Sequence, residues 1–511
     1  MSAQSGEGTA FQRRYKFCLY FPGIHSIIMG NLFVPAAPVS ARGDATQFEE
    51  HGDMNRFRTY IRPGARGHLI GVGGVSMSPL AEVLSGMGLV IRGSDMNEGE
   101  NIAHLREKGI EVRIGHRAEN LAEDAEFVVR TAAVHDDNPE VAEARRRGIP
   151  VFERSEAWGA LMQDYKNAVC ISGTHGKTTT TSMMTHILMA AQMDPTVMIG
   201  GTLPLLHAGH RIGEGDTIVM ESCEYCNSFL HFYPTIAVIL DIDADHLDFF
   251  KDLEDIKASF RQFASLVPED GHIIVNLDDA NTMDAVRPLG RKLMTFGLSE
   301  GADVRAEHIR SLGTRTDFDV LYHGKPYAHV HLNIPGMHNV LNALAASAAA
   351  ICLNCSPLAV QYGLSAFYGA GRRFEFKGKY NGADVYDDYA HHPGELKALL
   401  DATENLGYKR RIVVFQPHTY SRTKALFDDF VEQLRRPDMT VLAEIYAARE
   451  QNTIGISSRD MAQQIPNAMY FDSFEKILKA LRWTAAPGDM ILTVGAGDIY
   501  KLGEQLVENR R

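Results

Sequence analysis

The chain has 511 residues, of which 45% are hydrophobic and 23% are charged, the composition of a globular protein of about three domains. The formal net charge is −13, from 51 basic and 64 acidic residues, which argues against a general affinity for nucleic acid or for an anionic membrane. No apolar run approaches the roughly 20 residues that cross a bilayer. We therefore predict small-molecule substrates, with no nucleic acid and no membrane as a partner.

The first 53 residues resemble a secretory signal only loosely. A basic segment at 13–16 precedes an apolar stretch, but Pro22, Gly23 and Gly30 interrupt that stretch. The sequence becomes domain-like at Met54. We expect residues 1–53 to be a disordered extension or the product of a mis-assigned start.

Residues 54–164 are predicted to form a Rossmann-like domain. The sequence HLIGVGGVSM (68–77) reads as a strand, a glycine-rich turn and a helix, and Asp95 follows about 20 residues later after another apolar run. Such a turn binds a pyrophosphate, which could belong to NAD or to any other nucleotide diphosphate. The residues expected to contact this nucleotide are Gly71, Gly73, Gly74, Val75, Ser76, Met77, Ser94 and Asp95.

A phosphate-binding loop opens the second predicted domain, residues 165–370. The loop runs from Gly173 through Thr174, His175 and Gly176 to Lys177-Thr178-Thr179, between a buried strand expected at 167–172 and a helix expected at 181–193. Backbone N–H groups and a helix N-terminus bind phosphate oxygens, a lysine reaches the terminal phosphates, and a threonine hydroxyl binds Mg²⁺. The loop therefore predicts nucleotide binding with Mg²⁺.

Two acidic segments follow apolar runs expected to be buried parallel strands, at 217–221 and 236–240. The first segment offers Glu221 and Glu224, and the second offers His246 and four aspartates, Asp241, Asp243, Asp245 and Asp248. A single aspartate in such a run is more often solvated, but ligands of open α/β sheets bind at the carboxyl ends of strands. Hard oxygen donors beside a phosphate-binding loop favour Mg²⁺, and we expect Glu224 and His246 to belong to its site.

Residues 371–511 are predicted to form a second doubly wound α/β domain, with strands at 411–415, 439–442 and 490–494. Two segments that end strands, DDYAHHP (387–393) and FQPHTYSR (415–422), place Tyr, His and Arg side chains at one edge. They predict a small carboxylate-binding pocket with Arg422 as the charge partner.

The six cysteines include two C-x-x-C pairs, Cys223/Cys226 and Cys352/Cys355, which invite a zinc-ribbon interpretation. The pairs are 126 residues apart along the chain, and the second belongs to an Ala-rich segment expected to be a buried helix. Reduced thiols in a cytoplasmic protein are the better interpretation.

The ordered motifs GTHGKTTT, ESCEYCNSFL, DIDADHLD, PGMHNVLNALAA, GAGRRFE, DDYAHHPGE, FQPHTYSRT and GAGDI resemble the Mur ligase family over residues 54–511. The resemblance implies three α/β domains: a Rossmann-like N-terminal domain, a P-loop central domain with a mainly parallel sheet, and a Rossmann-like C-terminal domain. It also implies a cytoplasmic enzyme of peptidoglycan precursor synthesis. Its reaction is the ATP-dependent ligation of L-alanine to the carboxylate of UDP-N-acetylmuramate through an acyl phosphate.

The resemblance also implies residue roles. Lys177, Glu224, His246, His391 and Arg422 would be catalytic, with Thr178, Glu224 and His246 binding Mg²⁺. The remaining ATP contacts would come from His338, Asn339, Asn342, Arg373 and Asp388, with Arg372 also near the phosphates, and the glycine-rich turn of the first domain would bind the UDP-sugar. Tyr389, His391, His418 and Arg422 would form the L-alanine pocket.

Three positions depart from the family pattern: Thr419 where many relatives carry Arg, Leu240-Asp241 where Thr-Asn is frequent, and Ser76 where Gly is common. Three other functions stay open. They are a related ligase that joins a murein tripeptide to the same UDP-sugar, an NAD(P)-dependent oxidoreductase with an accessory ATPase, and a non-catalytic UDP-sugar sensor. The oligomeric state, monomer or homodimer, is also open.

Overall fold

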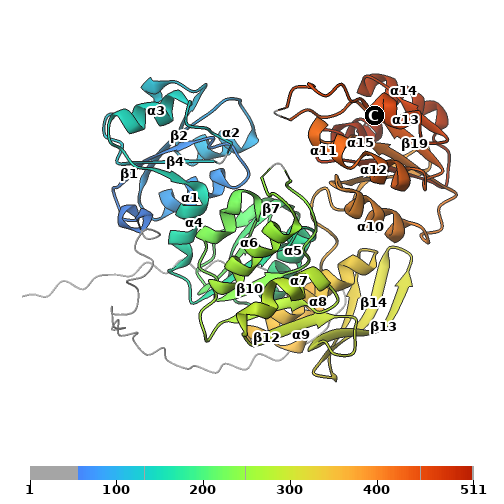
Figure 1. The fold of residues 1–511 in the computed structure, drawn as a ribbon, viewed down its shortest axis with the longest axis horizontal. Coiled ribbons are helices and arrows are strands. Elements are labelled where there is room, and N and C mark those ends of the chain that lie inside the picture. Colours follow the sequence, from blue (N-terminus) through green and yellow to red (C-terminus); the bar gives the residue numbers. More distant parts are fainter. Residues whose placement is uncertain (1–55, 132, 248, 449, 509–511) are drawn as a thin grey trace, which may run out of the picture. The chain divides into compact units, whose positions relative to one another are not determined.

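A computed structural model describes residues 56–508, except for 132, 248 and 449 (Figure 1). The predictions for residues 1–53 and for Asp248 lie outside this part of the chain. Over the described residues, each helix is too short or too polar to cross a membrane. The predicted fold class is confirmed, since three α/β sheets follow one another along the chain.

The first sheet is wholly parallel, with the strand order β3-β2-β1-β4-β5 of a doubly wound domain. Its central strands are apolar because both faces are covered, and Phe127 to Val129 of β4 are fully buried. The glycine-rich turn lies between β1 and α1, as predicted. The strands are β1 (Arg66–Ile70), β2 (Val90–Asp95), β3 (Glu111–Ile114), β4 (Phe127–Arg130) and β5 (Val151–Glu153). The helices are η1 (Phe57–Tyr60), α1 (Met77–Gly86), α2 (Glu100–Glu107), η2 (Ala118–Asn120), α3 (Pro139–Arg146) and α4 (Arg154–Met162).

The second sheet has ten strands in the order β15-β14-β13-β12-β11-β10-β6-β9-β7-β8. Strands β7, β9, β6, β10, β11, β12 and β13 run parallel, whereas β8, β14 and β15 are joined antiparallel. The strands are β6 (Asn167–Ser172), β7 (Thr196–Leu203), β8 (Ala208–Arg211), β9 (Thr217–Glu221), β10 (Ile236–Ile239), β11 (His272–Asn276), β12 (Leu293–Gly297), β13 (Val304–Leu312), β14 (Arg315–Tyr322) and β15 (Lys325–Leu332). Strands β13, β14 and β15, which pair antiparallel with one another, were not predicted.

Helices α5, α8 and α9 pack together on the second sheet, and the Ala-rich α8 is buried over most of its length. The helix expected at 181–193 begins earlier, as α5 (Lys177–Ala190), because Gly176 in the left-handed region directly precedes it. It ends before Gln192, which is itself left-handed with φ +58°. The other helices are η3 (Tyr225–His231), α6 (Leu253–Ser265), α7 (Ala280–Val286), η4 (Arg287–Leu289), α8 (Met337–Cys352) and α9 (Pro357–Ser365).

The third sheet has the order β16-β17-β21-β18-β19-β20, parallel except for the antiparallel pair of β16 and β17. Its strands are β16 (Glu375–Tyr380), β17 (Ala383–Asp388), β18 (Arg410–Phe415), β19 (Met439–Leu442), β20 (Ala468–Tyr470) and β21 (Asp489–Val494). The helices are α10 (Pro393–Thr403), α11 (Tyr420–Ala425), α12 (Phe427–Leu434), α13 (Ser458–Ala462), α14 (Phe474–Thr484) and α15 (Tyr500–Glu508). The segments predicted to carry the pocket follow β17 and β18, which both pair with β21.

Candidate active site

The phosphate-binding loop joins β6 to α5 in the middle of the second sheet. Gly173 and Gly176 have φ of +141° and +80°, a region that favours glycine. A Cβ at Gly176 would lie 2.4 Å from Oδ1 of Asn342 on α8. Glycine is therefore required here both by the backbone and by the close approach of α8.

Lys177 is the first residue of α5 and is held inside the loop. Its Nζ donates to the carbonyl oxygens of Gly173 and Thr174 and to Oε2 of Glu224 at 3.0 Å. Burial works against the charge, but the Glu224 carboxylate outweighs it and raises the pKa of Lys177 above its usual value. The lysine is therefore charged and held at the loop by the Glu224 carboxylate.

Thr178 donates its hydroxyl to Oε1 of Glu221 at 3.0 Å, and the backbone N–H of Gly200 donates to the other oxygen of Glu221 at 2.6 Å. Glu221 ends β9, next to β6 in the sheet. The sequence showed this carboxylate, but its pairing with Thr178 depends on strand order. Glu221 is thus a further oxygen donor at the predicted metal position.

Glu224 and His246 come from the loops after β9 and β10, the two strands that flank β6. His246 Nε2 lies 3.7 Å from Glu224 Oε1. The Cys223 sulfur is within 4.8 Å of both of these side chains' donor atoms. In the described part of the chain, this is the one group of three His, Cys, Asp or Glu donors close enough to share a metal ion. Cys352 and Cys355 lie elsewhere, against Met294 and Met193, so the two C-x-x-C pairs do not form a zinc ribbon.

Asp241 and Asp243 hold the phosphate-binding loop, although the Asp243 side chain is itself about half exposed. The N–H of His175 donates to Asp241 Oδ1 at 2.8 Å, the N–H of Thr174 donates to the Asp241 carbonyl, and the N–H of Asp243 donates to Thr174 Oγ1 at 2.8 Å. Burial raises the pKa of Asp241 to about 6. Although Leu240-Asp241 departs from the family pattern, Asp241 still accepts hydrogen bonds from the loop.

A cavity of about 290 Å³ opens beside the loop, between the central and C-terminal domains. Burial lowers the pKa of His338 in this cavity to about 4, so its imidazole is neutral, and burial raises the pKa of Asp388 to about 6. Eight of the predicted ATP residues, three of them from the loop, line this cavity: His175, Gly176, Thr179, His338, Asn339, Asn342, Arg373 and Asp388. The lining combines apolar side chains such as Phe296, Ile334 and Phe367 with polar ones, and such a cavity beside a phosphate-binding loop is a candidate site for an adenosine.

The contacts of Arg372 differ from the prediction that it lies near the phosphates. Its guanidinium donates to Asp387 Oδ2 at 3.0 Å and to the carbonyls of Gly495 and Gly497, and it stacks over the ring of Tyr389. Arg372 therefore holds the C-terminal domain together instead of pointing to the phosphate-binding loop, whereas Arg373 lines the cavity.

The four predicted amino-acid residues gather at the edge of the C-terminal domain. The ring of His391 lies 5.3 Å from that of Tyr389 and 5.9 Å from that of His418. Arg422 lies 3.5 Å from Nδ1 of His418 and donates to Asp245 of the central domain at 3.1 Å. Burial opposes ionisation of Asp245, but Arg422 and His246 lower its pKa to about 2.

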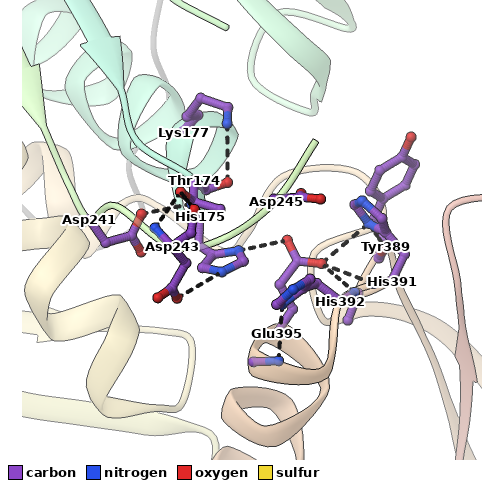
Figure 2. Close-up of polar contacts among 12 residues, drawn as sticks. Thr174, His175, Lys177, Asp241, Asp243, Asp245, Tyr389, His391, His392 and Glu395 are labelled. Carbon is purple, nitrogen blue, oxygen red and sulfur yellow. Dashed lines mark hydrogen bonds and ion pairs between the residues drawn. The ribbon is translucent and has the colours of Figure 1, made fainter. Parts of the chain in front are cut away.

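Two residues at this edge escaped the sequence prediction. The ring of Tyr446 stacks on His418 at 5.6 Å, and no pattern around Tyr446 indicated it. Glu395, on α10, accepts hydrogen bonds from the N–H groups of His391 and His392 and lies 3.4 Å from Nδ1 of His175 (Figure 2). The feature that could have pointed to Glu395 is the capping box that it forms with His392 at the start of α10.

Thr419 precedes α11, and its backbone is left-handed with φ +63°. Its N–H donates to the Tyr446 carbonyl at 2.9 Å, and its carbonyl accepts from Thr423 Oγ1. The residue thus aligns the start of α11, which carries Arg422, and offers a hydroxyl in place of a guanidinium.

In the N-terminal domain, the predicted UDP-sugar residues surround the turn after β1 and the end of β2. The N–H of Gly73 donates to Asp95 Oδ2 at 2.9 Å, which ties the turn to β2. Ser94 donates to Oε2 of the fully buried Glu140, which also binds His68 at 2.7 Å and Asn120. No role in the site was predicted for Glu140. Its pKa is about 2, because these hydrogen bonds outweigh the opposing effect of burial.

The fold and the site together define a nucleotide-binding protein of three α/β domains, in which a phosphate-binding loop faces polar residues of a third domain. Three domain families match the chain: the Mur ligase family, catalytic domain at residues 66–166, the Mur ligase middle domain at 171–350, and the Mur ligase, glutamate ligase domain at 372–497. The chain belongs to the Mur ligase family.

Curated relatives carry one activity in their names. The UDP-N-acetylmuramate–L-alanine ligase of Clostridium novyi is 47% identical over 86% of this chain and 97% of its own length. The ligase of the same name from Caldanaerobacter subterraneus is 45% identical over 90% of this chain and 99% of its own length. Among solved structures, the UDP-N-acetylmuramate–alanine ligase of Thermotoga maritima is 28% identical, with a TM-score of 0.74 over 87% of this chain and 98% of that one. A murein peptide ligase of Psychrobacter arcticus shares the fold, with a TM-score of 0.65 at 24% identity.

Proposed function

We propose that this chain is an ATP-dependent ligase that joins L-alanine to the carboxylate of UDP-N-acetylmuramate through an acyl-phosphate intermediate, in peptidoglycan precursor synthesis. The observation that carries the proposal is the charged Lys177 within the glycine loop, together with Glu224 and His246 on the two flanking loops. The names of the relatives support the choice of substrates.

The donor set fits Mg²⁺. The hydroxyl of Thr178 and the carboxylates of Glu221 and Glu224 are hard oxygen donors beside the loop that receives the triphosphate. By family resemblance, His246 would bind a second Mg²⁺. Bound Mg²⁺ supplies charge neutralisation for the phosphoryl oxygens.

In the first half-reaction, the muramate carboxylate attacks the γ-phosphate, and ADP leaves. Two anions must approach, so the site has to supply positive charge where negative charge develops. Lys177 is charged and lies at the loop, and Arg373 is the cation that lines the cavity from the C-terminal domain. Asn339, Asn342, His338 and Asp388 would hold the adenosine.

In the second half-reaction, the amine of L-alanine attacks the acyl carbon, and phosphate leaves from a tetrahedral intermediate. The amine loses a proton in this step, and burial lowers the pKa of His391, so its neutral imidazole can accept that proton. Arg422, with Tyr389 and His418 beside it, would bind the carboxylate of L-alanine.

The test is ADP release from ATP with Mg²⁺ and UDP-N-acetylmuramate, with L-alanine, glycine, L-serine or a murein tripeptide added in parallel. We expect L-alanine to support the fastest turnover. Turnover with the tripeptide alone would assign the chain to the recycling reaction instead, and no turnover with any of the four would overturn the proposal. A nicotinamide oxidoreductase and a non-catalytic sensor have no support from the family assignment or from the charged Lys177.

A further inference from the structure

Cys223 places a thiol beside two of the predicted metal ligands, Glu224 and His246. It follows β9 directly, next to Glu224, and its Sγ lies within 4.8 Å of the donor atoms of Glu224 and His246. The proposed function uses Glu224 and His246 but leaves this thiol without a role.

The histidine of this group is held in place before any metal binds. The N–H of His246 donates to Asp245 Oδ1 at 2.7 Å, and its carbonyl accepts from the N–H groups of Phe249 and Phe250. Its ring packs 4.8 Å from that of Tyr225. A ligand fixed by its backbone and by its neighbours loses little freedom when it binds a metal.

The spacing suits a small divalent ion. Glu224 Oε1 and His246 Nε2 are 3.7 Å apart. Zn²⁺ binds oxygen and nitrogen at about 2.0–2.2 Å, which at a tetrahedral angle separates two such donors by about 3.4 Å. A shift of a few tenths of an ångström therefore closes this pair around the ion. The Cys223 sulfur, within 4.8 Å of both atoms, would move up to the ion to become the third ligand at a bond length of about 2.3 Å.

The donor types discriminate between metals. Mg²⁺ favours an all-oxygen shell, whereas imidazole and thiolate favour Zn²⁺ and its chemical relatives. In zinc sites with three protein ligands, water or substrate takes the fourth position.

We propose that Cys223, Glu224 and His246 form a binding site for a thiophilic divalent cation such as Zn²⁺, with the metal bonded to the Cys223 sulfur. As the metal–sulfur bond forms, the thiol proton passes to solvent. Glu224 then exchanges its bond to Lys177 for one to the metal, so Zn²⁺ binding competes with the arrangement that receives ATP and Mg²⁺. The binding itself does not depend on the proposed ligase activity.

The test uses the full chain, freed of metal by a chelator and titrated with Co²⁺ as a spectroscopic probe of the zinc site. We expect the intense near-ultraviolet absorption of a cobalt–thiolate bond at one equivalent, erased by one equivalent of Zn²⁺. Cys223→Ser should lose this band and bind Zn²⁺ at least tenfold more weakly. The matched control Cys226→Ser, in the same C-x-x-C segment, should keep both.

His246→Gln tests the shared site, because it should weaken Co²⁺ binding while the thiolate band survives at saturating metal. The band surviving in Cys223→Ser, disappearing in Cys226→Ser, or being absent from the unmodified protein would each overturn the proposal. Circular dichroism verifies that each variant is folded. Because the absorption is recorded without substrates, failure of the ligase assignment leaves this result unaffected.

Discussion

The imidazole of His175, in the phosphate-binding loop, lies 3.4 Å from the carboxylate of Glu395 on α10. Its other ring nitrogen lies 3.4 Å from Asp243. These are ion-pair distances, longer than an ordinary hydrogen bond. One charged imidazole thus links the loop that receives ATP to the domain that carries the amino-acid residues (Figure 2).

This pair predicts a pH-dependent contact between the two domains. Burial works against the charge of His175, but Asp243 and Glu395 raise its pKa well above the usual value. A raised pKa means that the stabilisation is complete below about pH 6.5 and is lost as pH rises through the folded-state pKa. NMR titration of the His175 ring should give a midpoint above 6.5, and Glu395→Gln should lower it. An unchanged midpoint in this variant would show that the pair does not exist in solution.

Lys177→Ala should abolish ADP release while leaving the affinity for the UDP-sugar within a few-fold, because Lys177 belongs to the central domain and the predicted sugar contacts to the first. Kinetic assay and calorimetry measure the two quantities separately. Lys166→Ala, an exposed lysine just before β6, is the control and should retain activity. Equal loss of both properties in Lys177→Ala would mean that the domain roles are assigned wrongly.

Gly176→Ala should weaken the binding of a non-hydrolysable ATP analogue more than tenfold, because the new methyl group would meet Asn342 at 2.4 Å. The left-handed backbone alone costs about 1–2 kcal/mol for a residue with a Cβ. Gly290→Ala isolates that cost, since Gly290 has φ +60° and open space around it. The two variants binding the analogue equally well would refute the steric argument.

Glu140 should make the N-terminal domain sensitive to acid. Its hydrogen bonds lower its pKa from the ordinary 4.5 to about 2, so its carboxylate stabilises the domain fully above pH 4.5. About 3 kcal/mol is lost as pH falls from 4.5 toward 2, by 1.36 kcal/mol per pKa unit. Hydrogen exchange of the β1 and β2 amides should show this loss in the wild-type protein.

Glu140→Ala should be destabilised by about 3 kcal/mol already at neutral pH, because it leaves buried partners without their acceptor. On the same helix, Glu143 pairs with the exposed Arg146, so Glu143→Gln should change little. Similar exchange rates in the two variants would show that the buried network contributes no stability.

Much of the fold followed from local pattern. The strands β6, β9 and β19 were predicted to the residue, because buried parallel strands read as continuous apolar runs. The antiparallel strands β13, β14 and β15 were missed. Their exposed faces carry polar residues, so no continuous apolar run marks them in the sequence. The start of α5 was missed because Lys177 and Thr178 were assigned to the loop, although they are already helical.

The sequence by itself determined the kind of chemistry, since a glycine-lysine-threonine loop and acids at strand ends bind phosphate and metal wherever the strands lie. Only the tertiary structure decided which side chains come together around the predicted phosphate and metal sites. Glu395 reaches His175 from 220 residues away, Glu140 joins β1 to β2, and Arg372 turns into its own domain. These contacts depend on strand order and domain packing, which bring together charges that no local spacing relates.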